Sequence, residues 1–181
     1  MNGHDRFLAG HLLVATPLIG TLPFYRSVVF IGEHDEHGAL GLILNKPSEL
    51  AVAEVLPDLA AKVSAPRVVH IGGPVQVDAA MVLAHSATGD FAMGTVFPDV
   101  GLVPPDDPPD DATDLRVFAG FSGWDAGQLE GEIATGSWWA TPAHHDDLFV
   151  PDTDDLWVTM VRRLPGRSAL YASFPPDPRW N

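Results

Sequence analysis

Ser122, in the segment GFSGW (120–124), comes closest of the potential nucleophiles to a known catalytic pattern. The turn that carries a hydrolase serine requires G-x-S-x-G, and Trp124 stands where the second glycine is needed. The spacing from Ser122 to Asp125 is also that of a helix capping box. We therefore interpret Ser122 as the cap of a helix that begins here, and we predict no catalytic residue.

The following segment, QLEGEI (128–133), offers carboxylates and an amide. Glu130 and Glu132 are two residues apart and point in different directions on a helix, whereas Gln128 and Glu132 share one face. Leu129 and Ile133 mark the buried stripe beside them. This pattern favours a structural hydrogen bond from Gln128 and Glu132 to a loop, with ligand binding as the alternative.

Histidines and carboxylates cluster in EHDEH (33–37) and HHDD (144–147). Either segment would need the other segment or a distant ligand to form a selective metal site, and no H-E-x-x-H spacing or cysteine is present. Neither dinucleotide nor P-loop glycine spacing occurs, and the glycines of HIGGPV (70–75) run into a proline. We therefore expect no metal and no cofactor, and we interpret these glycines as permitting a tight turn.

Composition restricts the partners. The 181 residues carry a net charge of −14 and scattered basic residues, whereas a nucleic-acid interface needs a concentrated basic face. Direct nucleic-acid binding and attraction to anionic membranes are therefore unfavourable. The apolar stretch FLAGHLLVATPLIG (7–20) is too short to span a bilayer and lacks a clearly positive leading region, so we expect a cytoplasmic protein.

The apolar pattern predicts a single domain of strands and a few helices. The runs at 27–33 and 39–46 form a hairpin, and their nearly continuous apolar residues indicate burial on both faces. Further strands are expected at 11–15, 67–73, 79–86, 115–121 and 136–143. Helices are expected at 49–56 with Ser48 as its cap, at 58–63, after Ser122, and at 153–164 with Asp152 as its cap. An exposed acidic loop (104–114) and an extended tail (166–181) complete the chain.

Four segments occur in an order typical of one family: GHLLVATP, RSVVFIGEHDEHGALGLILNKP, IGGPV and GFSGWDAGQLEGEI. On these motifs the chain, from Gly10 to Leu164, resembles the YqgE/AlgH family of bacterial proteins. The resemblance implies an α+β fold, in which a bifurcated, largely antiparallel sheet folds into a pseudo-barrel with flanking helices. It implies no established reaction or cofactor, and the family name is tied to transcriptional regulation. The segment 104–114 departs from the family pattern.

The failed catalytic spacings favour a non-enzymatic binding or regulatory module, which would affect transcription indirectly through a protein or small-molecule partner. An acidic surface bearing tryptophan could dock a basic partner. Trp138 and Trp139 are adjacent on a strand, so one of them must face away from the core unless both faces are covered. The alternative is a small-molecule-binding enzyme or sensor. Its pocket would gather Glu33, His34, Asn45, Lys46, Ser122 and Gln128, with Glu132 beside them.

Overall fold

A computed structural model describes residues 7–89, 91 and 93–173. Within them one sheet contains ten strands: β1 (His11–Ala15), β2 (Val28–Asp35), β3 (Gly38–Ile43), β4 (Pro47–Ala51), β5 (Val68–Ile71), β6 (Val75–His85), β7 (Gly94–Phe97), β8 (Val100–Val103), β9 (Asp114–Asp125) and β10 (Trp138–Pro142). The helices are α1 (Val52–Val55), α2 (Gln128–Ala134), α3 (His145–Leu148) and α4 (Leu156–Arg163), with the 3-10 helices η2 (Pro57–Leu59) and η3 (Gly166–Ser173). No helix among the described residues is long and apolar enough to cross a membrane.

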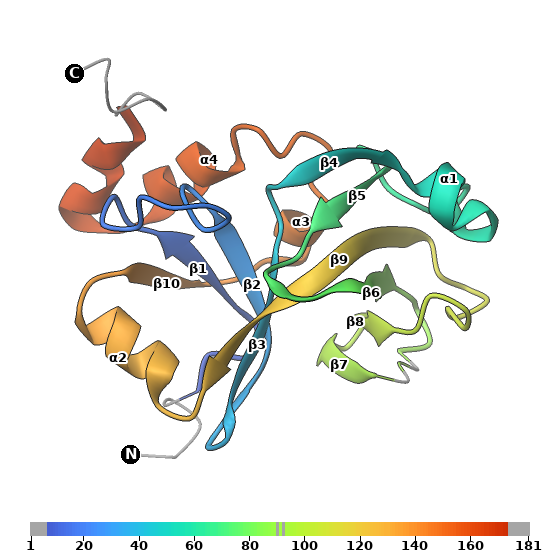
Figure 1. The fold of residues 1–181 in the computed structure, drawn as a ribbon, viewed down its shortest axis with the longest axis horizontal. Helices are drawn as coiled ribbons and strands as arrows, with labels where there is room; N and C mark the ends of the chain where they lie inside the picture. Colours follow the sequence, from blue (N-terminus) through green and yellow to red (C-terminus); the bar gives the residue numbers. More distant parts are fainter. Residues whose placement is uncertain (1–6, 90, 92, 174–181) are drawn as a thin grey trace.

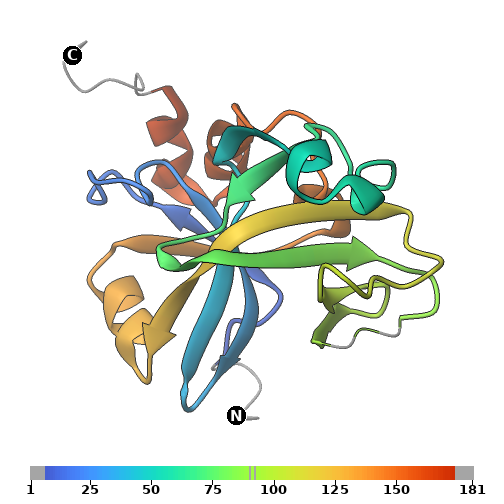
Figure 2. The same ribbon diagram turned by 45° about the vertical axis from the view of Figure 1, so that its right-hand side comes forward.

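The strand β9 joins the two halves of the sheet (Figures 1 and 2). The strand order is β10-β1-β2-β3-β9-β6-β8-β7, and β5 pairs with both β4 and β9. The end of β9 pairs with β3, as in Ser122 with Gly41, whereas its beginning pairs with β6. The β5–β9 ladder is parallel and the other ladders between strands are antiparallel. The predicted α+β class with a bifurcated, largely antiparallel sheet is confirmed.

Both faces of the β1–β2–β3 region are buried, as the apolar runs predicted. Alternate residues of a strand point to opposite faces, so Leu12 and Val14 enter one core cluster and Leu13 and Ala15 enter another. The helix α4 contributes Trp157 to the first cluster, and the helix α2 packs against β3, β9 and β10 on the side of the second. The hairpin is therefore a central element of the core.

The glycine pair of HIGGPV has a packing role. Gly72 donates its backbone N–H to the carbonyl of Ala119 at 2.9 Å. A Cβ at Gly72 would lie 2.2 Å from the carbonyl oxygen of Gly120, which no side chain could tolerate. Close approach of the chain at the end of β5 to β9 thus explains the glycine, in addition to the turn that the sequence suggested.

The predicted helix 49–56 is wrong in its first half. Residues 47–51 form the strand β4, and only α1 is helical. Ser48 donates its hydroxyl to the carbonyl of Val69 at 2.6 Å and caps no helix. Pairing of Pro47 with His70 supplies hydrogen bonding that the local helical pattern could not reveal. The next predicted helix, 58–63, is reduced to η2.

The C-terminal third also requires corrections. The helix α4 begins at Leu156, and the carboxylate of Asp152 accepts from the N–H of Asp154 instead of capping it. The predicted extended tail is wrong for residues 166–173, which form η3, while residues 174–181 lie outside the described residues. The predicted exposed loop 104–114 contains no strand or helix up to residue 113, whereas Asp114 begins β9 and Ala112 is buried.

Candidate functional site

Ser122 is a buried strand residue, so its assignment as a helix cap is wrong. The strand β9 continues to Asp125, and the left-handed Gly127 precedes α2. Ser122 is 0% exposed and donates its hydroxyl to the carbonyl of Gly72 at 3.1 Å. Alternating burial across residues 122–125 shows why: the segment continues the pleat of the sheet, and that requirement overrides the capping signal.

Gln128 and Glu132 both form structural hydrogen bonds, as predicted, but the main partners of Glu132 are tryptophans. One carboxylate oxygen of Glu132 accepts from Trp124 Nε1 at 2.9 Å and from Trp138 Nε1 at 2.8 Å. The other accepts from Gln128 Nε2 at 2.9 Å, while Gln128 Oε1 accepts from the N–H of Asp125 at 3.0 Å. This network fastens α2 to β9 and β10. Both carboxylate oxygens of Glu132 therefore already accept hydrogen bonds from other side chains of the protein.

The E-H and N-K-P motifs lie at opposite ends of the β2–β3 hairpin. His34 pairs with Ala39 in register, and Asn45 lies six residues further along, about 20 Å away at the usual strand rise. His34 is buried, accepts the N–H of Leu8 at 2.9 Å, and places Nε2 3.4 Å from a carboxylate oxygen of Glu130. The structure therefore does not bring His34 and Asn45 into one pocket.

Asn45 and Lys46 bind the turn that precedes β2. The side-chain oxygen of Asn45 accepts from the N–H of Val28 at 2.8 Å, and its amide donates to the carbonyl of Arg26 at 2.9 Å. Lys46 Nζ donates to the carbonyl of Tyr25 at 2.8 Å. Burial, and then the charge of Arg26, lowers the pKa of Lys46. Both side chains therefore have structural partners.

The tryptophans occupy opposite faces of β10, as their adjacency required. Trp138 is only 4% exposed and belongs to the core, which corrects its assignment to a contact surface. Trp139 is half-buried, with its ring centroid 5.6 Å from that of Tyr171 in η3. The helix η3, absent from the sequence prediction, partly covers the face on which Trp139 lies.

An open groove of about 490 Å³ lies between the β2–β3 hairpin tip and the end of β9. Exposed carboxylates of Glu33, Asp35 and Asp125 line it, together with His37, and no lysine or arginine lines it among the residues that the structure describes. Its apolar lining consists of Ala39, Leu40, Val75, Phe121 and Trp124. We call this surface the acidic groove. Among the predicted ligand-binding residues, only Glu33 lies in it.

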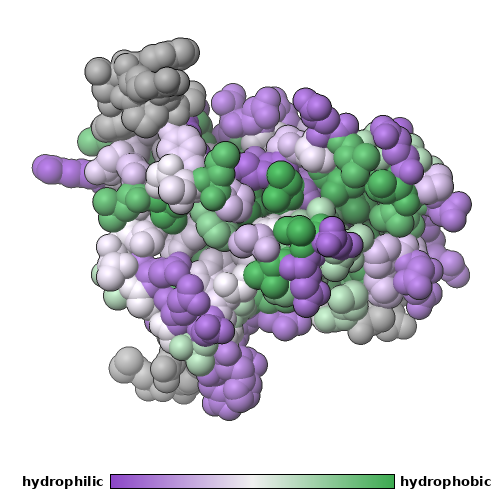
Figure 3. Space-filling view, viewed as in Figure 1, coloured by the Kyte–Doolittle hydropathy of each residue, from purple (hydrophilic) through white to green (hydrophobic). Residues whose placement is uncertain are grey.

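An apolar surface adjoins the acidic groove. Leu50, Val55, Ile71, Val75 and Val77 are exposed by 36–57%. Figure 3 shows hydrophobic side chains gathered over the β4–β5–β6 region and hydrophilic ones at the hairpin tip below. A hollow of about 310 Å³ is lined by Leu50, Val55 and Val77, and Val75 belongs to the acidic groove. An acidic and an apolar surface thus meet near the start of β6.

His70 and Arg116 are buried side chains of the strands β5 and β9, whose residues Val69 and Val117 line the apolar hollow. His70 is 0% exposed, and neither ring nitrogen has a hydrogen-bond partner among the described residues. Burial, followed by the charge of Arg116, lowers the pKa of His70 to about 4, although the backbones of Val68 and Val117 partly oppose this. Burial also lowers the pKa of Arg116 to about 10, and its guanidinium donates to the carbonyls of Ala65 and Val150.

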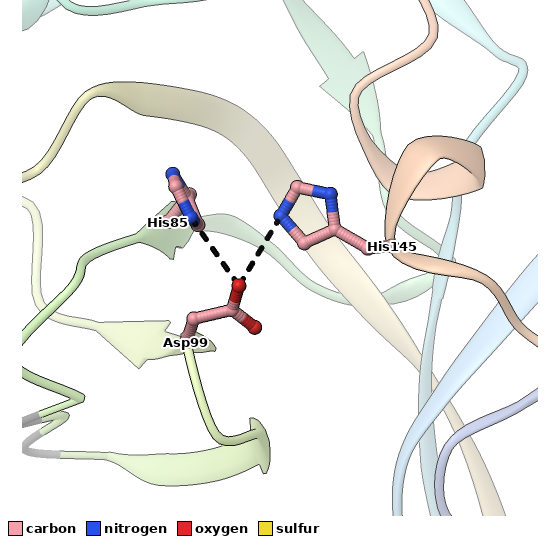
Figure 4. Close-up of side chains that lie close together, drawn as sticks. All are labelled: His85, Asp99 and His145. Carbon is pink, nitrogen blue, oxygen red and sulfur yellow. Dashed lines mark ion pairs between the residues drawn. The ribbon is translucent and has the colours of Figure 1, made fainter.

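A third polar cluster, which the sequence did not predict, combines His85 at the end of β6, Asp99 between β7 and β8, and His145 at the start of α3 (Figure 4). The Nε2 atoms of His85 and His145 lie 3.4 and 3.9 Å from the same carboxylate oxygen of Asp99. His145 belongs to the HHDD segment, for which sequence reasoning required a distant ligand. His85 and Asp99 carry no spacing signal that could have identified them as its partners.

Comparisons with known proteins agree with the fold and the motifs. A UPF0301 protein of Thermobifida fusca is 45% identical over 198 residues, covering 100% of both chains. The crystal structure of a Corynebacterium diphtheriae protein has a TM-score of 0.83 at 31% identity and covers 92% of each chain. The solution structure of the Pseudomonas aeruginosa AlgH protein has a TM-score of 0.68 at 28% identity, covering 97% of this chain and 98% of that one. Because the AlgH-like family profile also matches residues 12–169, this chain belongs to the AlgH-like family.

Proposed function

We propose that this chain is a non-enzymatic binding module whose acidic groove holds a basic, partly apolar segment of a protein partner. The single observation that carries the proposal is the convergence of Glu33, Asp35 and Asp125 around an apolar lining that contains no lysine or arginine among the described residues. Any effect on transcription would then be indirect, through this partner. Direct binding to nucleic acid fits poorly with a net charge of −14.

The dimensions of the groove favour an extended segment as its occupant. A volume of about 490 Å³ accommodates a few side chains, whereas a folded domain would need a larger complementary surface. Arginine or lysine side chains can pair with the carboxylates while their aliphatic stems lie on Leu40 and Phe121. Apolar residues of the same segment would continue past Val75 toward Val77.

Electrostatics and apolar burial would have different roles in this complex. Exposed carboxylates attract a cationic partner over about 10 Å at moderate salt and thereby raise the association rate and the selectivity. Burial of the exposed valines would supply the less salt-sensitive part of the affinity. The proposal therefore requires a partner segment that combines both residue types. A uniformly basic segment would leave Val77 in water.

Neutralising the groove is expected to reduce partner recovery at least tenfold. The test variant combines Glu33→Gln, Asp35→Asn and Asp125→Asn. Removal of the three carboxylates eliminates the charge complementarity of an interface, and each weakened pair is worth up to about 1 kcal/mol at an exposed site. Immobilised wild type and variant are exposed to native bacterial lysate, and the bound proteins are quantified by mass spectrometry.

A matched control changes the same net charge elsewhere: Asp106→Asn, Asp107→Asn and Asp110→Asn in the exposed acidic segment. This control should recover the partner as well as the wild type does. The proposal fails if no protein is enriched by the wild type. It also fails if every enriched protein is retained equally by the groove variant, or is lost equally from the control.

A further inference from the structure

The cluster of His85, Asp99 and His145 brings together side chains that are distant in sequence. The two imidazole Nε2 atoms and one carboxylate oxygen all lie within 4.8 Å of one another. They come from the end of β6, the turn between β7 and β8, and the start of α3 (Figure 4). Backbone elements on three sides therefore hold the donor atoms, in contrast to the exposed His37–Glu36 pair at the hairpin tip.

Hydrogen bonds on the far side of His85 indicate which of its ring nitrogens carries the proton. Nδ1 of His85 lies 2.7 Å from the hydroxyl oxygen of Thr113, and that hydroxyl donates to the carboxylate of Asp114 at 3.3 Å. Because the Thr113 proton is used for Asp114, its oxygen accepts the N–H of His85 Nδ1. The lone pair of neutral His85 is then on Nε2, directed toward Asp99. Orientation of a histidine by an outer hydroxyl and carboxylate is typical of metal ligands.

His145 has the same arrangement. Its Nδ1 lies 3.4 Å from a carboxylate oxygen of Asp146, which would accept the proton in the Nδ1-protonated tautomer. Its Nε2 is inaccessible to solvent and has no hydrogen-bond partner among the described residues. Two lone pairs thus face one carboxylate oxygen of Asp99. Three electron-rich atoms in this arrangement repel one another unless a proton on an imidazole nitrogen or a metal cation lies between them.

The separations fit a tetrahedral ion. Zinc bonds of about 2.0–2.1 Å to nitrogen and oxygen give ligand-to-ligand distances of about 3.3 Å in a tetrahedron. The observed distances from Asp99 to His85 and His145 are 3.4 and 3.9 Å, and all three donor atoms lie within 4.8 Å of one another, so the imidazoles would have to move closer together to complete the geometry. Mixed imidazole and carboxylate donors suit zinc better than Mg²⁺ or Ca²⁺, which favour oxygen ligands.

We propose that His85, Asp99 and His145 bind one Zn²⁺ ion, with Thr113 positioning His85. The side chains of the three ligands are 26%, 46% and 38% exposed, so the cluster lies near the surface, with His145 Nε2 itself shielded from solvent. A site with three protein ligands and one open position can bind water or an anionic group of a partner. A bound zinc ion would also link the end of β6 to the start of α3.

Untagged full-length protein is titrated with ZnCl₂ by isothermal calorimetry, and the stoichiometry is checked by competition with a chromogenic chelator. We expect one zinc per chain for the wild type. His145→Gln and Asp99→Asn each remove a ligand and should weaken binding by more than about 100-fold, because even loss of an outer partner typically costs 10–100-fold. Thr113→Val leaves all three ligands in place and should weaken binding by about 10–100-fold.

The matched control is His37→Gln, which removes an exposed histidine 3.7 Å from Glu36 and should leave zinc affinity unchanged. Imidazole nitrogen NMR provides an independent readout: zinc should shift the Nε2 resonances of His85 and His145 in the wild type. The proposal is overturned if the wild type binds no zinc. Binding that survives the combined His85→Gln and His145→Gln variant, or that depends equally on His37, would also overturn it.

Discussion

Replacing Glu132 by leucine is expected to lower the free energy of unfolding by about 4 kcal/mol. One carboxylate oxygen of Glu132 accepts both indole N–H groups of Trp124 and Trp138, which are 6% and 4% exposed. Leucine offers no acceptor, and each buried donor left without a partner costs about 1–3 kcal/mol. Chemical denaturation followed by tryptophan fluorescence measures the loss.

Two further variants distinguish the loss of the hydrogen-bond acceptor from the general effect of replacing a glutamate in a helix. Glu132→Gln retains one acceptor oxygen and should lose about 1–2 kcal/mol. Glu54→Leu, at an exposed position of α1, should change stability by less than about 0.5 kcal/mol. A Glu132→Leu protein within 1 kcal/mol of the wild type would refute the structural role assigned to the carboxylate.

A double-mutant cycle tests the coupling directly. Trp138→Phe removes one of the two donors that Glu132 accepts. In that background Glu132→Leu leaves only the Trp124 donor without a partner, so its cost should fall by about 1–3 kcal/mol. Strictly additive effects would show that the carboxylate and the indole do not interact in solution.

The stability of the protein is expected to fall by about 3 kcal/mol as the pH decreases from 6.5 to 4, through His70 alone. Burial, and secondarily Arg116, lowers the pKa of His70 from 6.5 to about 4. Between these values the unfolded chain binds a proton that the folded chain does not, so acid favours unfolding. The contribution is fully present above pH 6.5 and is lost by the time the pH falls through 4. Each pH unit is worth about 1.4 kcal/mol.

The measurement is the difference in unfolding free energy between pH 6.5 and 4.5, compared for the wild type and His70→Leu. Surface carboxylates titrate in both proteins, so the comparison cancels most of their contribution. His70→Leu should show the smaller acid loss by about 2–3 kcal/mol. Equal losses in the two proteins would mean that His70 titrates close to its ordinary value.

The sequence predicted the fold well where local pattern and burial agree. The two apolar runs of the hairpin, at 27–33 and 39–46, correctly indicated a strand pair buried on both faces. The prediction failed where pairing with a distant strand overrode a local signal. Ser122 has the spacing of a helix cap, yet it lies in β9 opposite Gly41; Ser48 likewise binds β5.

The candidate sites depended even more on tertiary structure. Sequence spacing placed Gln128 and Glu132 on one helical face, and their hydrogen bond at 2.9 Å follows from that periodicity. Nothing in the spacing indicated that Glu132 would also accept from two indoles. Glu33 lies in the acidic groove, whereas Asn45 lies at the far end of the same hairpin. Residues of neighbouring sequence motifs therefore do not necessarily lie in the same pocket.

The sequence by itself determined the acidic character of the chain, its buried hairpin and the family pattern of motifs, because these follow from composition and from periodicity along one strand or helix. Only the tertiary structure decided which side chains meet. The long strand β9 joins both halves of the sheet and positions Trp124 above Glu132, while α3 brings His145 to His85 and Asp99. These encounters depend on strand register and chain path, which local residue patterns do not encode.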